Sequence, residues 1–243
     1  MFCGAKLLRD AMIRTIKNEQ RYHFQNEWLS TYWHFSFDHY YDPANMGFGA
    51  LRVFNDDWIL PDSGFPMHSH REMEIITYVL EGELEHKDST GGIGLIRGGE
   101  VQRMSAGTGI RHSERNSSKD TRVHLLQMWI TPASSGLDPS YEQKQFTMEE
   151  RTGKLLAVAS GQKMPGAVEV HQDATLYVSS LRPQEEIGFA MADRRKAYLF
   201  VIDGELQLNG HEMAAGDQAR IEAERELRFV ASKPTEIALI DLS

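Results

Sequence analysis

Short runs of β-branched and aromatic residues recur along the chain, and turn residues separate them. The clearest runs cover residues 49–55, 73–80, 123–131, 155–159, 175–181, 197–202, 227–230 and 236–240. Pairs such as Asn209-Gly210 stand between the runs and are typical of β-turns. Long helical periodicity is absent, and the best helix candidate, residues 140–151, is short. The pattern therefore predicts an all-β protein.

A linker and a faint repeat predict two copies of one β-barrel. Residues 132–139, PASSGLDP, form the clearest linker, because they are rich in Pro, Ser and Gly. YVLEGELEH at 78–86 has an echo in FVIDGELQLNG at 200–210, and GGEVQRMSAG at 98–107 has one in AAGDQARIEAE at 214–224. We expect a metal-binding barrel over 12–135 and a degenerate barrel without metal over 136–243. Residues 1–11 would be an optional N-terminal extension, since Met12 is a second plausible start.

Composition narrows the function classes. Hydrophobic residues make up 41% of the 243 positions and charged residues 25%, which is ordinary for a globular protein. The net charge of −9 and the scattered basic residues argue against direct nucleic-acid binding. Apolar runs stay well short of the ~20 residues that cross a bilayer. With Cys3 alone and a poor signal peptide, we expect a cytoplasmic protein without an intrachain disulfide or a membrane contact.

Two H-x-[HE] pairs are the strongest chemical signal. They are His68-Ser69-His70, after a Gly-Phe-Pro turn, and His112-Ser113-Glu114, after a glycine-rich turn. Residues two apart on a β-strand share a face, with Cα atoms about 6.6 Å apart, so each pair could converge on one ion. Facing strands would supply three imidazoles and one carboxylate. That set suits Fe, Mn, Co, Ni, Cu or Zn and leaves room for water or substrate.

Nearby polar residues extend this hypothesis. Glu74 has the parity of His68 and His70, so it is a candidate fifth ligand, a partner that orients an imidazole, or a general base. Asn116 shares the His112 face and could hydrogen-bond a ligand or substrate. The other histidines, including His86, are assigned structural roles. Motifs for a serine elbow or for nucleotide binding are absent.

Longer motifs carry a family resemblance. The G-F-P-x-H-x-H-x3-E-x7-G stretch at 64–82 resembles the first cupin motif, and G-x8-G-x4-H-x3-N at 98–116 is similar to the second. HFSFDHYYDP (34–43), GALRVFNDD (49–57), HSHREMEIITYVLEGELEHKDS (68–89) and MSAGTGIRHSE (104–114) resemble the pirin family. Within it, the chain resembles bacterial pirin-like proteins associated with quercetin 2,3-dioxygenase activity. The likeness covers 12–131, and the second half matches only in its barrel pattern.

The resemblance implies an architecture and a metal site. It implies a bicupin, two β-barrel (double-stranded β-helix) domains, with the metal in the N-terminal barrel. By position the metal ligands would be His68, His70, His112 and Glu114, with Glu74 behind them. Fe(II) is the first expectation for the divalent cation, and Zn, Mn, Co, Ni or Cu are alternatives.

The implied activity is a metal-dependent dioxygenase that opens the central ring of quercetin or a similar flavonol and releases carbon monoxide. Glu114 or Glu74 would take the proton of the substrate hydroxyl. Apolar side chains that could receive the aromatic substrate are Phe65, Met67, Ile76, Tyr78 and Met104. One alternative is a metal-containing regulatory pirin that acts through a protein partner. Another is a cupin oxygenase for a different enolic or phenolic substrate. A monomer is the default expectation.

Overall fold

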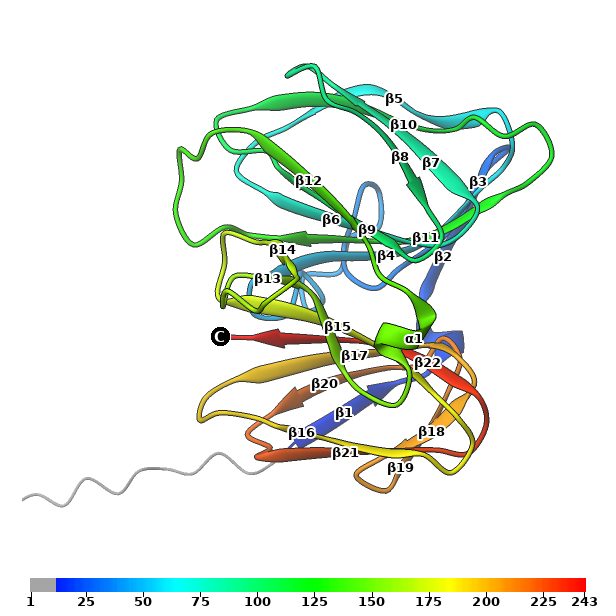
Figure 1. The fold of residues 1–243 in the computed structure, drawn as a ribbon, viewed down its shortest axis with the longest axis vertical. Helices are drawn as coiled ribbons and strands as arrows, with labels where there is room; N and C mark the ends of the chain where they lie inside the picture. The colour runs from blue at the N-terminus through cyan, green and yellow to red at the C-terminus, as the bar shows by residue number, and fades with distance from the viewer. Residues whose placement is uncertain (1–11) are drawn as a thin grey trace, which may run out of the picture.

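The computed structural model describes residues 12–243, and most of them lie in β-strands (Figure 1). Two domains are stacked along the long axis, and each has a seven-stranded sheet facing a four-stranded sheet. The predicted all-β class with two barrel domains is therefore confirmed. The expected extension at 1–11 lies outside the described residues. Between residues 12 and 243, no helix is long and apolar enough to cross a membrane.

The first domain pairs a large sheet of order β12-β9-β6-β11-β4-β3-β2 with a small sheet of order β5-β10-β7-β8. Its strands are β2 (Tyr22–Gln25), β3 (Leu29–Trp33), β4 (Leu51–Ile59), β5 (Ser63–His70), β6 (Glu74–Glu81), β7 (Glu83–Asp88), β8 (Ile93–Arg97), β9 (Glu100–Ser105), β10 (Ile110–Asn116), β11 (Val123–Ile130) and β12 (Ser140–Gln145). A 3-10 turn, η1 (Asn18–Gln20), precedes β2, and a short helix, α1 (Met148–Arg151), follows β12.

The second domain pairs a large sheet of order β1-β20-β17-β22-β15-β13-β14 with a small sheet of order β16-β21-β18-β19. Its strands are β1 (Met12–Ile16), β13 (Leu156–Ser160), β14 (Val168–Glu169), β15 (Ala174–Leu181), β16 (Glu186–Ala190), β17 (Lys196–Asp203), β18 (Glu205–Leu208), β19 (His211–Ala214), β20 (Gln218–Glu222), β21 (Glu226–Ala231) and β22 (Thr235–Leu242).

The predicted repeat is visible in the strand order. β9, β6, β11 and β4 of the first large sheet take the places that β20, β17, β22 and β15 take in the second. The first echo spans β6–β7 and β17–β18, and both copies turn at a glycine, Gly82 or Gly204, with φ of +78° or +85°. A Cβ there would collide with the carbonyl oxygen of Arg122 or Pro234. Both corners therefore require glycine.

Two strands depart from the predicted domain bounds. β1 pairs with β20 of the second domain, although residues from 12 onward were assigned to the first barrel. β12 pairs with β9 of the first domain, although residues from 136 onward were assigned to the second. Each strand satisfies the outer edge of the other domain's large sheet. The predicted helix over 140–151 is correspondingly wrong, because β12 takes up its first half and only α1 is helical.

The large sheets of the two domains pack against each other. Their shared apolar core includes Phe54 and Met128 from the first domain and Phe200 and Ile240 from the second. Strand alternation divides β6 accordingly: Ile76 and Tyr78 face this interface, whereas Ile75 and Val79 face the interior of the first barrel. The expectation that Ile76 and Tyr78 line a substrate site is therefore wrong.

The exchanged strand β1 should stabilise the second domain. Ile13 packs against the buried core of that domain, and we expect Ile13→Asp to cost about 2 kcal/mol because it buries a charge against apolar side chains. The measurement is the melting temperature of the full chain by calorimetry. Arg14→Ser, at the exposed neighbouring position, is the control and should leave the melting temperature unchanged. Equal melting temperatures for Ile13→Asp and the control would contradict the prediction.

Candidate metal centre

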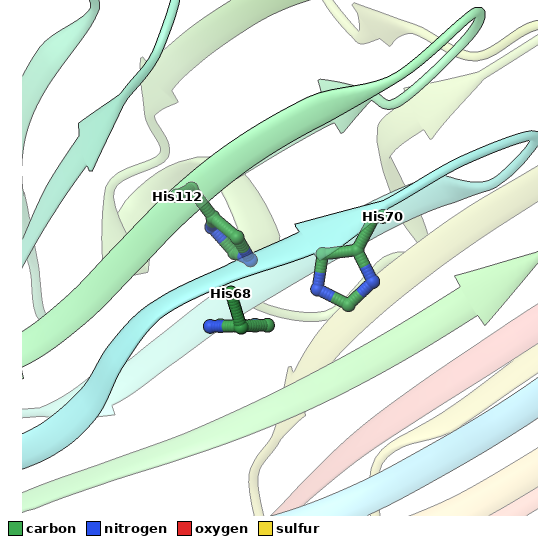
Figure 2. Close-up of side chains that lie close together, drawn as sticks. All are labelled: His68, His70 and His112. Atoms are coloured by element: carbon green, nitrogen blue, oxygen red, sulfur yellow. The ribbon is translucent and has the colours of Figure 1, made fainter.

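Three imidazoles converge inside the first barrel. β5 places His68 and His70 on one face, and antiparallel pairing with β10 sets His112 directly opposite His68. The ring centroids of His68 and His112 are 4.4 Å apart, those of His68 and His70 4.7 Å, and those of His70 and His112 4.9 Å. One nitrogen of each ring lies within 4.8 Å of the others (Figure 2). This spacing allows the three rings to share one cation.

Glu114 lies beside His112 on the inner side of the same strand. A β-bulge between the two residues shifts the register, so that Glu114 pairs with Phe65. The carboxylate is buried, and its Oε2 accepts a hydrogen bond of 2.8 Å from Gln127 Nε2. A ligand atom of Glu114 lies within 4.8 Å of His112 and His86, which form a second group with it. Three of the four predicted ligands thus form one cluster, and the fourth adjoins it through His112.

The protonation states of the imidazoles suit ligation. Burial, with smaller contributions from the neighbouring histidines, lowers the pKa of His70 to about 4 and that of His112 to about 3. Both rings are therefore neutral at pH 7 and carry a lone pair on one nitrogen. His68 Nδ1 lies 2.8 Å from the carbonyl oxygen of Pro66 and donates its hydrogen to it, which leaves the lone pair on Nε2.

Two buried atoms at this site call for a cation. His112 Nε2 and Glu114 Oε1 are both buried, and neither has a hydrogen-bond partner among residues 12–243. Buried polar atoms without a partner are rare in folded proteins. A divalent cation held by imidazoles and a carboxylate would satisfy both atoms, and that donor set suits first-row transition metals. The residues present therefore fit a metal ion.

Two residues that sequence reasoning missed support the carboxylate. Trp129 Nε1 donates to Gln127 Oε1 over 3.2 Å, and Gln127 in turn donates to Glu114. The Trp129 ring also stands edge-on to His70, with centroids 4.8 Å apart. Gln127 interrupts an apolar run with a polar residue that points into the barrel, and this interruption was the available signal. Both residues lie on β11, so the large sheet braces the site built on the small sheet.

Comparison with known proteins identifies the family. Residues 15–130 match the family described as Pirin, and residues 157–242 match the one described as the quercetinase C-terminal cupin domain. Over 231 residues the chain is 43% identical to quercetin 2,3-dioxygenase of Escherichia coli K12, covering 95% of this chain and 99% of that protein. The chain belongs to the pirin family. The resemblance inferred from the motifs is thereby confirmed.

Solved pirin structures agree with this fold. The crystal structure of YhhW from E. coli has a TM-score of 0.91 at 42% identity and covers 96% of this chain and 98% of its own. Bacterial pirin YhhW in complex with nickel(II) has a TM-score of 0.90 at 42% identity, covering 95% and 99%. A pirin-like protein of Caulobacter vibrioides is 42% identical over 215 residues, which are 88% of this chain and 92% of that protein. The predicted bicupin architecture is confirmed.

Glu74 lies away from the cluster, and its predicted role as a ligand or base is wrong. Its carboxylate is fully buried at the domain interface, where Oε2 accepts hydrogen bonds from the backbone nitrogen and Nδ1 of His171, at 3.0 and 3.2 Å. The parity argument failed because β5 ends at His70 and β6 begins at Glu74 in a different sheet. Between them Glu72, with φ of +50°, turns the chain and resets the alternation.

Asn116 has a structural role rather than the predicted contact with a ligand. Its side-chain amide donates to the carbonyl oxygens of Ile59 and Thr121, at 3.1 and 2.8 Å, and its Oδ1 accepts from the Ser118 backbone. These bonds fix the corner that follows β10. All three polar functions of the side chain are therefore used within the fold.

The second barrel of this pirin has apolar residues where the first has its cluster. Strand pairing aligns Phe189 with His68, Leu227 with His112 and Phe229 with Glu114. Leu227 and Phe229 are fully buried in the core of the second domain. These side chains offer no donor atoms, so the observed donor set belongs to the first barrel alone within the described chain.

Asp57 should make the stability of the metal-free protein depend on pH. Its side chain points into the first barrel, and burial raises its pKa to about 7, with Asp56 and Glu114 adding to the rise. The unfolded value is about 4, so the folded state binds the proton more tightly. The resulting stabilisation is complete below about pH 4 and is lost as the pH rises through about 7.

We expect Asp57→Asn to raise the melting temperature at pH 8 by several degrees and to have little effect near pH 4.5, because the amide cannot ionise. Thermal unfolding of chelator-treated protein at both pH values measures this difference. Asp193→Asn, at an exposed position, is the control and should behave like wild type at both. A difference between Asp57→Asn and wild type that is the same at both pH values would contradict the assignment.

Proposed function

We propose that this pirin is a metal-dependent dioxygenase that cleaves quercetin or a similar flavonol. The observation that carries the proposal is the cluster of three imidazoles beside the buried, unpartnered Oε1 of Glu114, unpartnered with respect to residues 12–243. The name of the E. coli relative, quercetin 2,3-dioxygenase, and the nickel(II) in the YhhW complex support it. The fold alone would not support the proposal, because one fold can have many functions.

His68, His70 and His112 would hold the cation, with Glu114 as the fourth ligand. Fe(II) is the first candidate, and Ni, Zn, Mn, Co or Cu would also suit these donors. When bound, the cation supplies Lewis acidity that lowers the pKa of the flavonol 3-hydroxyl, together with the means to engage dioxygen. Affinity alone does not identify the native metal, because it follows the Irving–Williams order.

The residues of the chain would bind, orient and deprotonate the substrate. Gln127 holds Oε2 of Glu114 in place, so Oε1 is the atom that would either bind the cation or, when it is released from the cation, accept the proton of the 3-hydroxyl. A surface pocket of about 340 Å³ beside His70 includes Arg71 and Arg111 in its lining. These two cationic side chains would attract an anionic flavonolate to this side of the small sheet.

The metal cluster is tested by removing one imidazole. We expect His70→Ala to bind Ni(II) or Fe(II) at least 10-fold more weakly and to lose quercetin-dependent oxygen uptake and carbon monoxide release, because one ligand is missing. Ser69→Ala, the adjacent residue on the other face of β5, is the matched control and should retain both properties. Oxygen uptake and carbon monoxide release by the metal-loaded wild type are measured alongside.

A wild type that binds metal but neither consumes oxygen nor releases carbon monoxide with quercetin would refute the proposed substrate class. The values of kcat/KM for a panel of enolic and phenolic compounds then decide whether another substrate is preferred. The same panel would expose quercetin cleavage as a side activity, since a true substrate would be turned over more efficiently.

The role of Glu114 as a base is tested by an isosteric change. We expect Glu114→Gln to lower kcat for quercetin by about 10²- to 10⁴-fold, because the amide cannot take the proton. At matched Ni(II) occupancy, calorimetric titration should show that this variant still binds quercetin while the absorption band of bound flavonolate fails to form. That combination separates loss of deprotonation from loss of binding. Formation of that band with an undiminished kcat would show that another group accepts the proton.

A further inference from the structure

His86 and Asp88 form a buried pair next to the metal cluster. Both lie on β7 and point into the first barrel, and the pairing of β7 with β10 sets His86 opposite Glu114 and Asp88 opposite His112. Neither side chain is exposed to solvent. The proposed ligand set does not include them. Their hydrogen bonds indicate which nitrogen of each imidazole ring carries the hydrogen.

The two carboxylate oxygens of Asp88 have separate hydrogen-bond partners. Oδ1 accepts hydrogen bonds from the backbone nitrogen and hydroxyl of Thr90, at 2.8 and 2.6 Å, and from the Gly92 backbone at 3.0 Å. Oδ2 lies 3.1 Å from His86 Nε2. A carboxylate only accepts hydrogen bonds, so Nε2 of His86 must carry the hydrogen.

The hydrogen on His86 Nε2 determines the state of His112. In a neutral His86 ring the lone pair is then on Nδ1, which lies 3.4 Å from His112 Nδ1. Gln102 Nε2, an amide nitrogen that only donates, lies 3.5 Å from the same His86 atom. With His86 in this tautomer, His112 Nδ1 is the donor, and the lone pair of His112 is on Nε2. That is the buried nitrogen without a hydrogen-bond partner in the described chain.

We propose that His86 and Asp88 are positioning residues that hold His112 in the tautomer whose Nε2 is free to bind the metal. Metal-bound histidines commonly donate their second N–H to a carboxylate or carbonyl, and here an imidazole relays that bond to the carboxylate. The inference rests on the metal site of the proposed function, and it is independent of the flavonol chemistry.

A second cation is the competing explanation. His86, His112 and Glu114 also bring ligand atoms within 4.8 Å of one another. A second ion at this group would bind the lone pair of His86 Nδ1. In our proposal that lone pair instead accepts the hydrogen bond from His112. The two explanations therefore differ in metal stoichiometry and in the position of the hydrogen on His112.

Asp88→Asn should reverse the donors and acceptors in this chain of hydrogen bonds, because asparagine has nearly the same shape as aspartate but can donate. The three donors of Thr90 and Gly92 hold the amide oxygen at the place of Oδ1, so the NH₂ group faces His86 Nε2. His86 would then carry its hydrogen on Nδ1 and donate to His112, whose own hydrogen moves to Nε2. We expect Ni(II) affinity to fall about 10- to 100-fold, measured by competition with a chromophoric chelator.

The tautomer is read directly by ¹H–¹⁵N NMR of the histidine rings in metal-free protein at pH 8, where an ordinary imidazole is neutral. Wild type should show His112 with its hydrogen on Nδ1, and Asp88→Asn should show it on Nε2. The wild-type spectrum needs no variant, so it tests the proposal even if a substitution impairs folding. It also needs no substrate, so failed quercetin cleavage does not affect it.

A double-mutant cycle separates positioning from a structural role of Asp88 in its turn. In a His86→Phe background, Asp88→Asn should change Ni(II) affinity by less than about twofold, because no imidazole remains to relay the change. A loss of equal size in both backgrounds would overturn the proposal. So would a hydrogen on Nε2 of wild-type His112, or binding of two ions with one lost in His86→Phe.

Discussion

The pairing of β10 with both of its neighbours is the constraint on which the site depends. Hydrogen bonding to β5 on one edge brings His112 opposite His68, and bonding to β7 on the other brings it opposite Asp88. A slip of one residue would turn every inward side chain of β10 outward. Gly64 permits the close approach of β5, because a Cβ there would collide with the carbonyl oxygen of Glu114. The register thus fixes both the cluster and its hydrogen-bonded support.

Packing of the two large sheets leaves the small sheet of the first domain, which carries the three histidines, on the outside of the molecule (Figure 1). The strands β1 and β12 connect the domains. β1 completes the large sheet of the second domain, and β12 completes that of the first. Polar contacts add to the apolar interface: Arg103 donates to the carbonyl oxygen of Glu169 over 2.6 Å, and Glu74 binds His171. Glu74 therefore serves assembly rather than chemistry.

The periodicity of the sequence predicted features that lie within one strand, such as which side chains share a face. It failed to predict features that depend on turns and on the sheet to which a strand belongs. His68 and His70 share a face because alternation is a property of one strand, and the β class followed from the same signal. Glu74 was misplaced because the turn at Glu72 and the change of sheet are tertiary features. The exchange of β1 is equally non-local. His86 and Asp88 are two residues apart, like the two ligand pairs. Their role could not be predicted from this spacing, because it depends on the residues that β10 places opposite them.

The contrast between the two barrels explains how the first can hold so many buried polar groups. In the first barrel, atoms such as Thr77 Oγ1, Gln102 Oε1 and Glu114 Oε1 lack partners within the described chain, and each such group costs about 1–3 kcal/mol. Leu208 and Phe229 fill the equivalent interior of the second barrel and contribute apolar burial instead. Because the domains share a core and exchange strands, stability gained in the second barrel offsets the polar interior of the first. The second barrel thus fills with apolar side chains the positions at which the first barrel has its polar cluster.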